Sequence, residues 1–301
     1  MDTRILVGTE SGLWQLRGDA LEPVDPFTAR TVTAIARSGQ DTWAIVDGRA
    51  LWHDGGGRWH ERAALGDRPA TCLAATPDGL LIGTAEAHLL SFRGNTAEPV
   101  ASFEAVDGRE DWHTPWGDPA DVRSMAVALD GTLYVNVHVG GVVRSRDAGQ
   151  SWTPTLDIEV DVHQVIAHPA RPGVVLVAAY DGFGISRDAG YSWQFITEGM
   201  HAHYARAVAV SDEAVMVSAS RGPGGSRATL YRKPLDDASA FVRCEGLPWF
   251  DSNIDTACLA TNGPLAVFGT DDGRVYWSVD GGAHWGLVTK GLPTITAVTI
   301  G

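Results

Sequence analysis

Short apolar runs, each four to six residues long, recur along the whole chain between turns rich in Gly, Asp and Pro. Seven of these runs occupy equivalent places in the pattern: Val32–Ile35, Thr71–Ala74, Val122–Val127, Val162–Ile166, Ala205–Val208, Thr256–Leu259 and Ile295–Val298. Short runs without a helical period predict strands. Their first residues lie 39 to 51 residues apart, and repetition at such a period is typical of propeller blades, with each run as the innermost strand.

The two ends of the chain complement each other in this pattern. The seventh run lies at the C-terminal end, whereas the N-terminal end begins with the pattern of a second strand, Ile5–Thr9, followed by Gly12–Trp14. We therefore expect Ile295–Ile300 to pair with Arg4–Gly8 and to close the ring, which hides sheet edges. The sequence predicts an all-β fold, a seven-bladed β-propeller formed by residues 1–301 as a single domain.

An eight-residue pattern, S-x-D-x-G-x-x-W, occurs three times and once in degenerate form. The copies are Ser145–Trp152, Ser186–Trp193, Ser278–Trp285 and the degenerate Trp52–Trp59. The pattern predicts a hairpin corner, because Asp accepts hydrogen bonds from turn amides and Gly supplies a positive φ. The Trp then begins the next strand and covers apolar surface.

These copies resemble the Asp-box repeat of the BNR, sialidase-type family. The resemblance implies a β-propeller with each box between the third and fourth strands of a blade. It also implies that the boxes are structural and lie away from an active site, so Asp147, Asp188 and Asp280 are expected to have no catalytic role.

The likeness to sialidases indicates the fold and hardly the substrate. Arg123, Arg206 and Arg221 could imitate the arginine trio with which sialidases hold a substrate carboxylate. Sialidase cores, however, have six blades, and the F/Y-R-I-P motif of sialidases is absent from this chain. Similar boxes occur in photosystem-assembly and sorting-receptor propellers, which are not glycosidases.

Three connections are longer than the others, namely Glu104–Asp121, Ser218–Ala228 and Gly246–Asp255. Long ordered loops on a rigid scaffold often carry function. The first contains carboxylates, Trp112, His113 and Trp116. It is expected to form either a pocket wall or a lid whose Trp residues pack on the rim.

The second position of the inner strands sets three successive blades apart. Four blades carry small or apolar residues there, Thr33, Cys72, Ala257 and Thr296, and three carry Arg123, His163 and Arg206. Charged groups in a narrow channel need partners. They are expected either to form a structural network with Asp121, Asp161 and Glu198 or to bind an anion, because Arg grips carboxylates and phosphates bidentately.

Five of the ten histidines are expected near the same mouth of the channel: His113, His138, His163, His201 and His203. The other five, among them His168, fall in hairpins or outer strands and are expected at the surface. Histidine is an acid–base near neutral pH and the commonest metal ligand. We predict catalytic roles for His163, His138 and His113, and a divalent transition metal held by members of the five, although no H-E-x-x-H spacing is present. The predicted substrate-binding residues are Arg123, Arg206, Arg221, Tyr180, Trp112 and Trp249.

The charge and cysteine content limit which binding partners and which cellular location are expected for the protein. The formal net charge of −14 disfavours nucleic acid and anionic membranes, no apolar run reaches the roughly 20 residues of a membrane span, and no secretory signal is visible. The cysteines Cys72, Cys244 and Cys258 show no metal-type spacing. Cys72 and Cys258 are expected to be buried thiols, which favours a reducing, cytoplasmic location.

Two functions fit this pattern. The first is an enzyme, of hydrolase or lyase type, that acts on a small anionic molecule at the channel mouth, with metal assistance as one option. The second is a non-catalytic propeller that binds a partner protein through an apolar rim of Trp112, Trp116, Trp249 and Phe250. The concentration of polar residues in one sector favours the enzyme.

Overall fold

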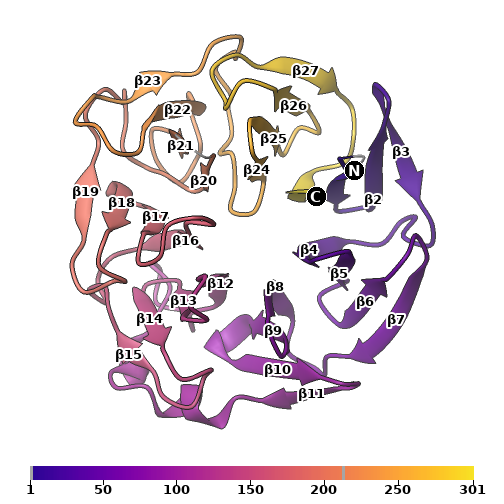
Figure 1. Ribbon diagram of the computed structural model, residues 1–301, viewed down its shortest axis with the longest axis vertical. Coiled ribbons are helices and arrows are strands. Elements are labelled where there is room, and N and C mark those ends of the chain that lie inside the picture. The colour runs from indigo at the N-terminus through magenta and orange to yellow at the C-terminus, as the bar shows by residue number, and fades with distance from the viewer. Residues whose placement is uncertain (1–2, 212–213) are drawn as a thin grey trace. The chain divides into compact units, whose positions relative to one another are not determined.

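The computed structural model describes residues 3–211 and 214–301 and shows a seven-bladed β-propeller (Figure 1). Each blade is a four-stranded sheet in which sequential strands lie side by side. The residues group into two compact units. The first contains Met1–Val32, Tyr180–Phe183 and Phe195–Gly301, and the second contains Thr33–Ala179 and Gly184–Gln194.

Three sheets belong to the first unit. From the innermost strand outward they are β28 (Ile295–Ile300), β1 (Ile5–Thr9), β2 (Gly12–Arg17) and β3 (Ala20–Val24); β20 (Val208–Val210), β21 (Ala214–Ala219), β22 (Thr229–Pro234) and β23 (Val242–Arg243); and β24 (Leu259–Asn262), β25 (Leu265–Gly269), β26 (Val275–Ser278) and β27 (Gly286–Thr289).

Three further sheets belong almost wholly to the second unit. They are β4 (Val32–Ser38), β5 (Asp41–Val46), β6 (Ala50–Asp54) and β7 (Trp59–Ala64); β8 (Ala70–Thr76), β9 (Gly79–Thr84), β10 (Leu89–Arg93) and β11 (Thr96–Pro99); and β12 (Val122–Val127), β13 (Leu133–Val137), β14 (Val142–Ser145) and β15 (Thr153–Pro154).

The seventh sheet begins in the second unit with β16 (Val162–Ala167) and β17 (Val175–Ala179), followed by β18 (Gly182–Ser186) and β19 (Gln194–Ile196). Within the described residues, three 3-10 helices of three to five residues accompany the strands: η1 (Ala85–Ala87), η2 (Ala101–Ala105) and η3 (Arg109–Asp111). In the described part of the chain, no helix is long and apolar enough to span a membrane.

The C-terminal strand completes the first blade, as predicted. β28 pairs antiparallel with β1, and Val7 lies opposite Val298. Beyond the last ladder pair, Arg4 and Gly301 exchange two backbone hydrogen bonds of 2.7 and 2.9 Å. The termini therefore lie together in the first unit (Figure 1).

The predicted inner strands are correct in five blades and begin too early in two. β20 and β24 start at Val208 and Leu259, the last residues of their predicted runs. Before β20, the Ser218 hydroxyl accepts hydrogen bonds from the backbone amides of residues 206 and 207, at 3.1 and 2.9 Å. Before β24, Ala257 has a φ of 62°, which lies outside the strand region.

Where β12 and β28 begin, the inner strand touches a glycine in the second strand of the preceding blade. A Cβ added to Gly83 of β9 would lie 2.5 Å from Cγ1 of Val122, the first residue of β12. Gly269 faces Ile295 in the same way, at 2.4 Å. The missing side chain makes room for a β-branched residue, and the backbone at both glycines is ordinary extended chain.

The S-x-D-x-G-x-x-W turns form the hairpin corners that the pattern predicts, between third and fourth strands. In the turn after β18, the Asp188 carboxylate accepts hydrogen bonds from the Ser186 hydroxyl at 2.8 Å and from the amide and hydroxyl of Ser192 at 2.8 and 2.6 Å. Gly190 has a φ of 87°. The turn after β14 repeats these contacts around Asp147.

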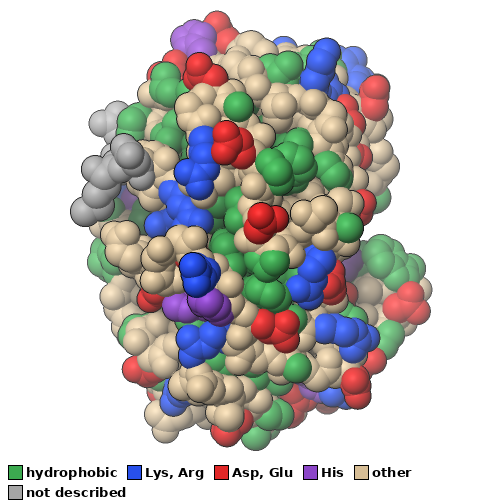
Figure 2. Space-filling view, turned by 90° about the vertical axis from the view of Figure 1, so that its right-hand side faces the viewer, with side chains coloured by type: hydrophobic (Ala, Val, Ile, Leu, Met, Phe, Trp, Pro, Cys, Tyr) green, Lys and Arg blue, Asp and Glu red, His purple; other side chains and the backbone are tan. Residues whose placement is uncertain are grey.

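The burial of cysteine and histidine side chains agrees only in part with the prediction from the sequence. The cysteine thiols are free and buried, as predicted for Cys72 and Cys258. His168, which the sequence indicates as a surface residue, is buried, and its Nδ1 accepts a 3.0 Å hydrogen bond from the Ala170 amide. On the face shown in Figure 2, charged side chains of both signs are interspersed with hydrophobic ones.

The contacts of inner strands with glycines of the preceding blade give the first prediction. Gly83→Ala should lower the free energy of unfolding by about 1–3 kcal/mol, the usual cost of overpacking a core. Gly224→Ala is the matched control, because a Cβ at Gly224 meets nothing within 4 Å. Urea denaturation of the two variants measures the difference, and equal stabilities would contradict this account of how blades pack.

The turns give a prediction for pH dependence. Hydrogen bonds from the side chain and backbone of Ser192 lower the pKa of Asp188 to about 2, against an ordinary value of about 3.9. The unfolded chain therefore binds a proton first, so this carboxylate stabilises the fold above about pH 4, and the contribution is lost as the pH falls towards 2.

Asp188→Asn should accordingly flatten the rise of the urea midpoint with pH between about 2.5 and 5. Asp107→Asn, at an exposed carboxylate outside the turns, is the control and should keep the wild-type slope. Parallel profiles for wild type and Asp188→Asn would show that the turn carboxylate does not support the fold electrostatically.

Candidate functional site

Arg123 and His163, which the alignment of inner strands sets apart, are both extra residues of β-bulges. The pairing of β12 with β13 shifts at Arg123, and the pairing of β16 with β17 shifts at His163. A bulge bends the strand and redirects a side chain, and bulges are common beside active sites. These two positions are therefore structurally equivalent within the second unit.

The same bulge occurs in β8 at Thr71, which corrects the sequence alignment. The alignment placed Cys72 at this position, but Cys72 pairs with Gly83, and the register shift falls one residue earlier. The apolar run contains no signal for a bulge, so the alignment was wrong by one residue in this blade.

In blades with threonine at the bulge, the hydroxyl joins neighbouring inner strands. Thr71 donates a hydrogen bond to the carbonyl oxygen of Val122, the residue before Arg123. The equivalent carbonyl in the next blade, that of Val162, accepts a 2.7 Å hydrogen bond from Nδ2 of Asn136 instead. Asn136 thus supplies the link between strands where the bulge residue is Arg123.

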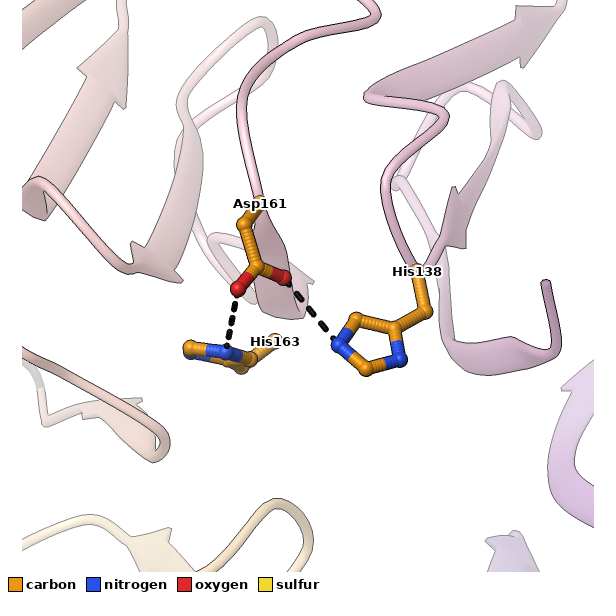
Figure 3. A group of neighbouring side chains, drawn as sticks. All are labelled: His138, Asp161 and His163. Carbon is orange, nitrogen blue, oxygen red and sulfur yellow. Dashed lines mark ion pairs between the residues drawn. The ribbon is translucent and has the colours of Figure 1, made fainter. Parts of the chain in front are cut away.

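His163 belongs to a compact cluster with His138 and Asp161 (Figure 3). The two oxygens of Asp161 divide between the histidines: Oδ2 lies 3.2 Å from Nε2 of His163, and Oδ1 lies 3.2 Å from Nε2 of His138. His138 comes from the turn after β13, and Asp161 immediately precedes β16. Asp161 and His163 are two residues apart, a spacing that places side chains on one side of an extended chain.

The cluster is largely withdrawn from solvent. The His163 side chain is 0% exposed, that of His138 is 11% exposed and that of Asp161 is 15% exposed. Burial raises the pKa of Asp161, but hydrogen bonds from His138 and His163 and their charges outweigh it. The pKa of Asp161 is consequently well below its usual range, so the group is a carboxylate at neutral pH.

The long loop after η2 is anchored beside this cluster. The backbone amide of His113 donates a 3.1 Å hydrogen bond to the carbonyl oxygen of Val139. The backbone amide of His138 donates a 3.0 Å hydrogen bond to the backbone carbonyl oxygen of Asp121, at the end of the loop. The Trp116 ring meets the His138 ring edge-on at 5.5 Å between centroids, although Trp116 is 70% exposed. The loop is thus anchored beside His138, and we call its residues 104–121 the lid.

Two other predicted residues of the second unit take part in the loop itself. Nδ1 of His113 is 2.7 Å from the carbonyl oxygen of Thr114. The Trp112 ring packs against Phe103 at 5.5 Å and lies under the Arg109 guanidinium, 5.0 Å from its carbon. These contacts of His113 and Trp112 stabilise the lid itself. The catalytic role predicted for His113 and the substrate-binding role predicted for Trp112 stay predictions.

Arg206 is ion-paired in the first unit. Its Nη1 lies 2.6 Å from Oδ1 of Asp255, and its Nε donates a 3.1 Å hydrogen bond to the Tyr204 hydroxyl. Burial lowers the pKa of Arg206, but Asp255 outweighs this effect and raises it. Tyr180 packs against the rings of Tyr204 and His203, at 5.8 and 5.7 Å between centroids.

The remaining predicted residues are His201, Arg221 and Trp249, which belong to the first unit. His201 meets Trp249 edge-on at 4.8 Å, and its Nδ1 lies 2.9 Å from the Tyr231 hydroxyl. Burial lowers the pKa of His201, as do the charges of Arg227 and Arg221.

Among all described residues, the group of three side chains close enough to hold one metal ion is His138, Asp161 and His163, whose ligand atoms lie within 4.8 Å of one another. His113, His201 and His203 are not members of this group. Sequence reasoning named Asp161 only as an ion-pair partner, and the Asp161-x-His163 spacing was the available signal for it as a ligand.

Comparisons with known proteins place the fold but not the family. No protein-family profile matches the chain, and no curated protein matches its sequence. The enzyme NkGH74, a GH74 enzyme of Niastella koreensis, is similar in structure with a TM-score of 0.63 at 14% identity, over 85% of this chain and 45% of the enzyme. This chain therefore spans less than half of that enzyme.

Two smaller solved structures have the same fold. YCF48 bound to D1 peptide gives a TM-score of 0.61 at 14% identity, over 92% of this chain and 87% of YCF48. The RRP9 WD40 repeats give a TM-score of 0.62 at 16% identity, over 89% of this chain and 83% of the other. Likenesses at this identity establish the seven-bladed β-propeller class alone.

The cluster generates a stability prediction. Asp161→Asn should lower the free energy of unfolding by about 1–3 kcal/mol, because an amide lacks the charge that attracts both imidazoles, whose Nε2 atoms lie 3.2 Å from the carboxylate oxygens. Glu159→Gln, an exposed change two residues earlier, is the control. Urea denaturation with a chelator present isolates the protein's own contacts. Wild-type stability of Asp161→Asn would show that the carboxylate does not hold the histidines.

Proposed function

We propose that this propeller is an enzyme of hydrolase or lyase type that acts on a small anionic molecule, with a divalent transition metal at His138, Asp161 and His163. The observation that carries the proposal is this buried cluster of two imidazoles and one carboxylate. We also propose that its S-x-D-x-G-x-x-W turns are Asp boxes of the BNR type, which the repeated contacts of Asp147 and Asp188 support.

The donor set suits a catalytic metal. Imidazole nitrogens and a carboxylate oxygen bind divalent transition metals, and three protein ligands leave a position open for water or substrate. Metal binding requires deprotonated ligands, and the lowered pKa of Asp161 provides one at neutral pH. Such a metal activates water or polarises an oxygen of the substrate.

Residues around the cluster have separate roles in this proposal. Arg123, at the equivalent bulge of the neighbouring blade, attracts the anionic substrate. The lid excludes bulk water with Trp116, and His113 carries a proton to or from the substrate. The substrate-binding roles predicted for Arg206 and Tyr180, which belong to the first unit, stay predictions.

The competing function is a scaffold that binds a partner protein. The 70% exposure of Trp116 and the likeness in fold to YCF48 bound to D1 peptide favour it. The likeness to the GH74 enzyme and the buried cluster favour catalysis. A cytoplasmic location is part of the proposal on the strength of the free thiols.

Metal analysis of protein purified without a His tag tests the proposal. We expect about one Zn²⁺, Mn²⁺ or Fe²⁺ per chain after exposure to each metal and desalting. His163→Asn removes the Nε2 position and should weaken binding by more than the roughly 10- to 100-fold that loss of an outer-shell partner costs. His168→Asn is the matched control, because His168 directly follows β16, is also buried and lies outside the cluster.

Activity against a panel of phosphate, sulfate and carboxylate esters supplies the second readout. Turnover should depend on the bound metal, fall in His163→Asn and persist in His168→Asn. Wild-type protein that retains no metal would refute the metal centre. Stoichiometric metal with no turnover of any ester, and full partner binding without it, would favour the scaffold.

A further inference from the structure

The Trp249 side chain in the first unit is surrounded by cationic groups. The guanidinium carbon of Arg227 lies 4.5 Å from the centre of its ring, and that of Arg243 lies 4.4 Å away. Trp249 is nevertheless 37% exposed. Arginine stacks on indole through cation–π attraction, so the indole holds two positive charges together at the surface. We call Arg221, Arg227, Arg243, His201 and Trp249 the arginine–tryptophan surface.

The backbone fixes this surface before any ligand arrives. Arg227 has a φ of 55°, a left-handed conformation that is uncommon for a residue other than glycine. The next residue, Ala228, exchanges two backbone hydrogen bonds with Phe250, at 2.8 and 2.9 Å. The chain on either side of Arg227 and Trp249 is thereby locked, and a residue held in a strained conformation often marks a binding site.

The guanidinium group of Arg243 is held in place by hydrogen bonds. Its Nε donates a 3.2 Å hydrogen bond to the Thr229 hydroxyl, and its Nη2 donates to the carbonyl oxygens of Leu247 and Pro248. These acceptors are neutral, so the positive charge of Arg243 stays uncompensated. Its guanidinium is positioned without being neutralised.

The arginines of this surface form no ion pairs within the described residues. Within residues 3–211 and 214–301, none of Arg221, Arg227 and Arg243 forms an ion pair, although the chain has 37 acidic and 23 basic residues. The charges of all three act on His201 and lower its pKa after burial has done so. An uncompensated positive cluster on an acidic protein attracts negative partners selectively.

We infer that the arginine–tryptophan surface binds an acidic peptide segment of a partner protein. Guanidinium groups match carboxylates in shape and charge, and Arg and Trp are the residues that dominate binding energy at protein interfaces. Two guanidinium groups and the His201 ring already lie against the indole, which leaves little π surface to stack a nucleobase. The net charge of −14 also disfavours a long polyanion such as nucleic acid.

This inference is independent of the proposed metal-assisted activity. The surface shares no residue with His138, Asp161 or His163 and lies in the other unit. It gives Arg221 and Trp249 a partner-binding role in place of the substrate role expected from the sequence.

Fluorescence anisotropy with a labelled ten-residue peptide of alternating Glu and Gly tests it. We expect saturable binding that weakens as salt is raised, because exposed charges are screened. Trp249→Ala and Arg227→Gln should each weaken binding by about 10-fold or more. Arg62→Gln is the matched control, because Arg62 also lies over a tryptophan, Trp43, at 6.0 Å, and its loss should change nothing.

Circular dichroism confirms that the variants are folded, and charge reversal in Arg227→Glu should abolish binding. No binding to the peptide, or equal weakening by Arg62→Gln, overturns the inference. Inorganic phosphate or a single-stranded oligonucleotide that displaces the peptide at lower concentration than unlabelled peptide does would overturn the choice of a carboxylate ligand. The metal-binding measurements on His163→Asn are unaffected by either result.

Discussion

The seating of a β-branched residue on a glycine of the preceding blade is the contact on which the rest of the structure depends. Val122 on Gly83 and Ile295 on Gly269 fix where β12 and β28 begin. In β12 the next residue is the bulge, which carries Arg123. The Arg123 side chain is therefore positioned by core packing one residue earlier.

The sequence predicted the seven blades well because the signals for them are local. An Asp carboxylate, a Gly at positive φ and a Trp close each corner within eight residues, as the turn around Asp188 does. Strand starts were predicted less well, since they depend on contacts between strands. The start of β20 depends on the Ser218 hydroxyl, 12 residues from Arg206, and β24 depends on the left-handed Ala257. An apolar pattern contains neither signal.

The candidate site was predicted in part for the same reason. His138 and His163 were identified because their blades break the repeat, and Asp161 was identified only as a neighbour. In the structure, Asp161 directs one carboxylate oxygen to each histidine. This arrangement depends on the register of β16 with β17 and on the turn after β13, and the sequence pattern alone specifies neither. His168 was misjudged as exposed because its burial comes from packing, although it directly follows a strand.

The choice between a structural network and a functional site turns on Asn136. In blades that carry threonine at the bulge, the hydroxyl joins one inner strand to the next, as Thr71 does with Val122. Here Asn136 makes the equivalent bond to Val162, so the fold retains its link while the bulge carries Arg123. Because Asn136 makes the bond between the strands, the bulge position is not needed for that bond and can carry Arg123.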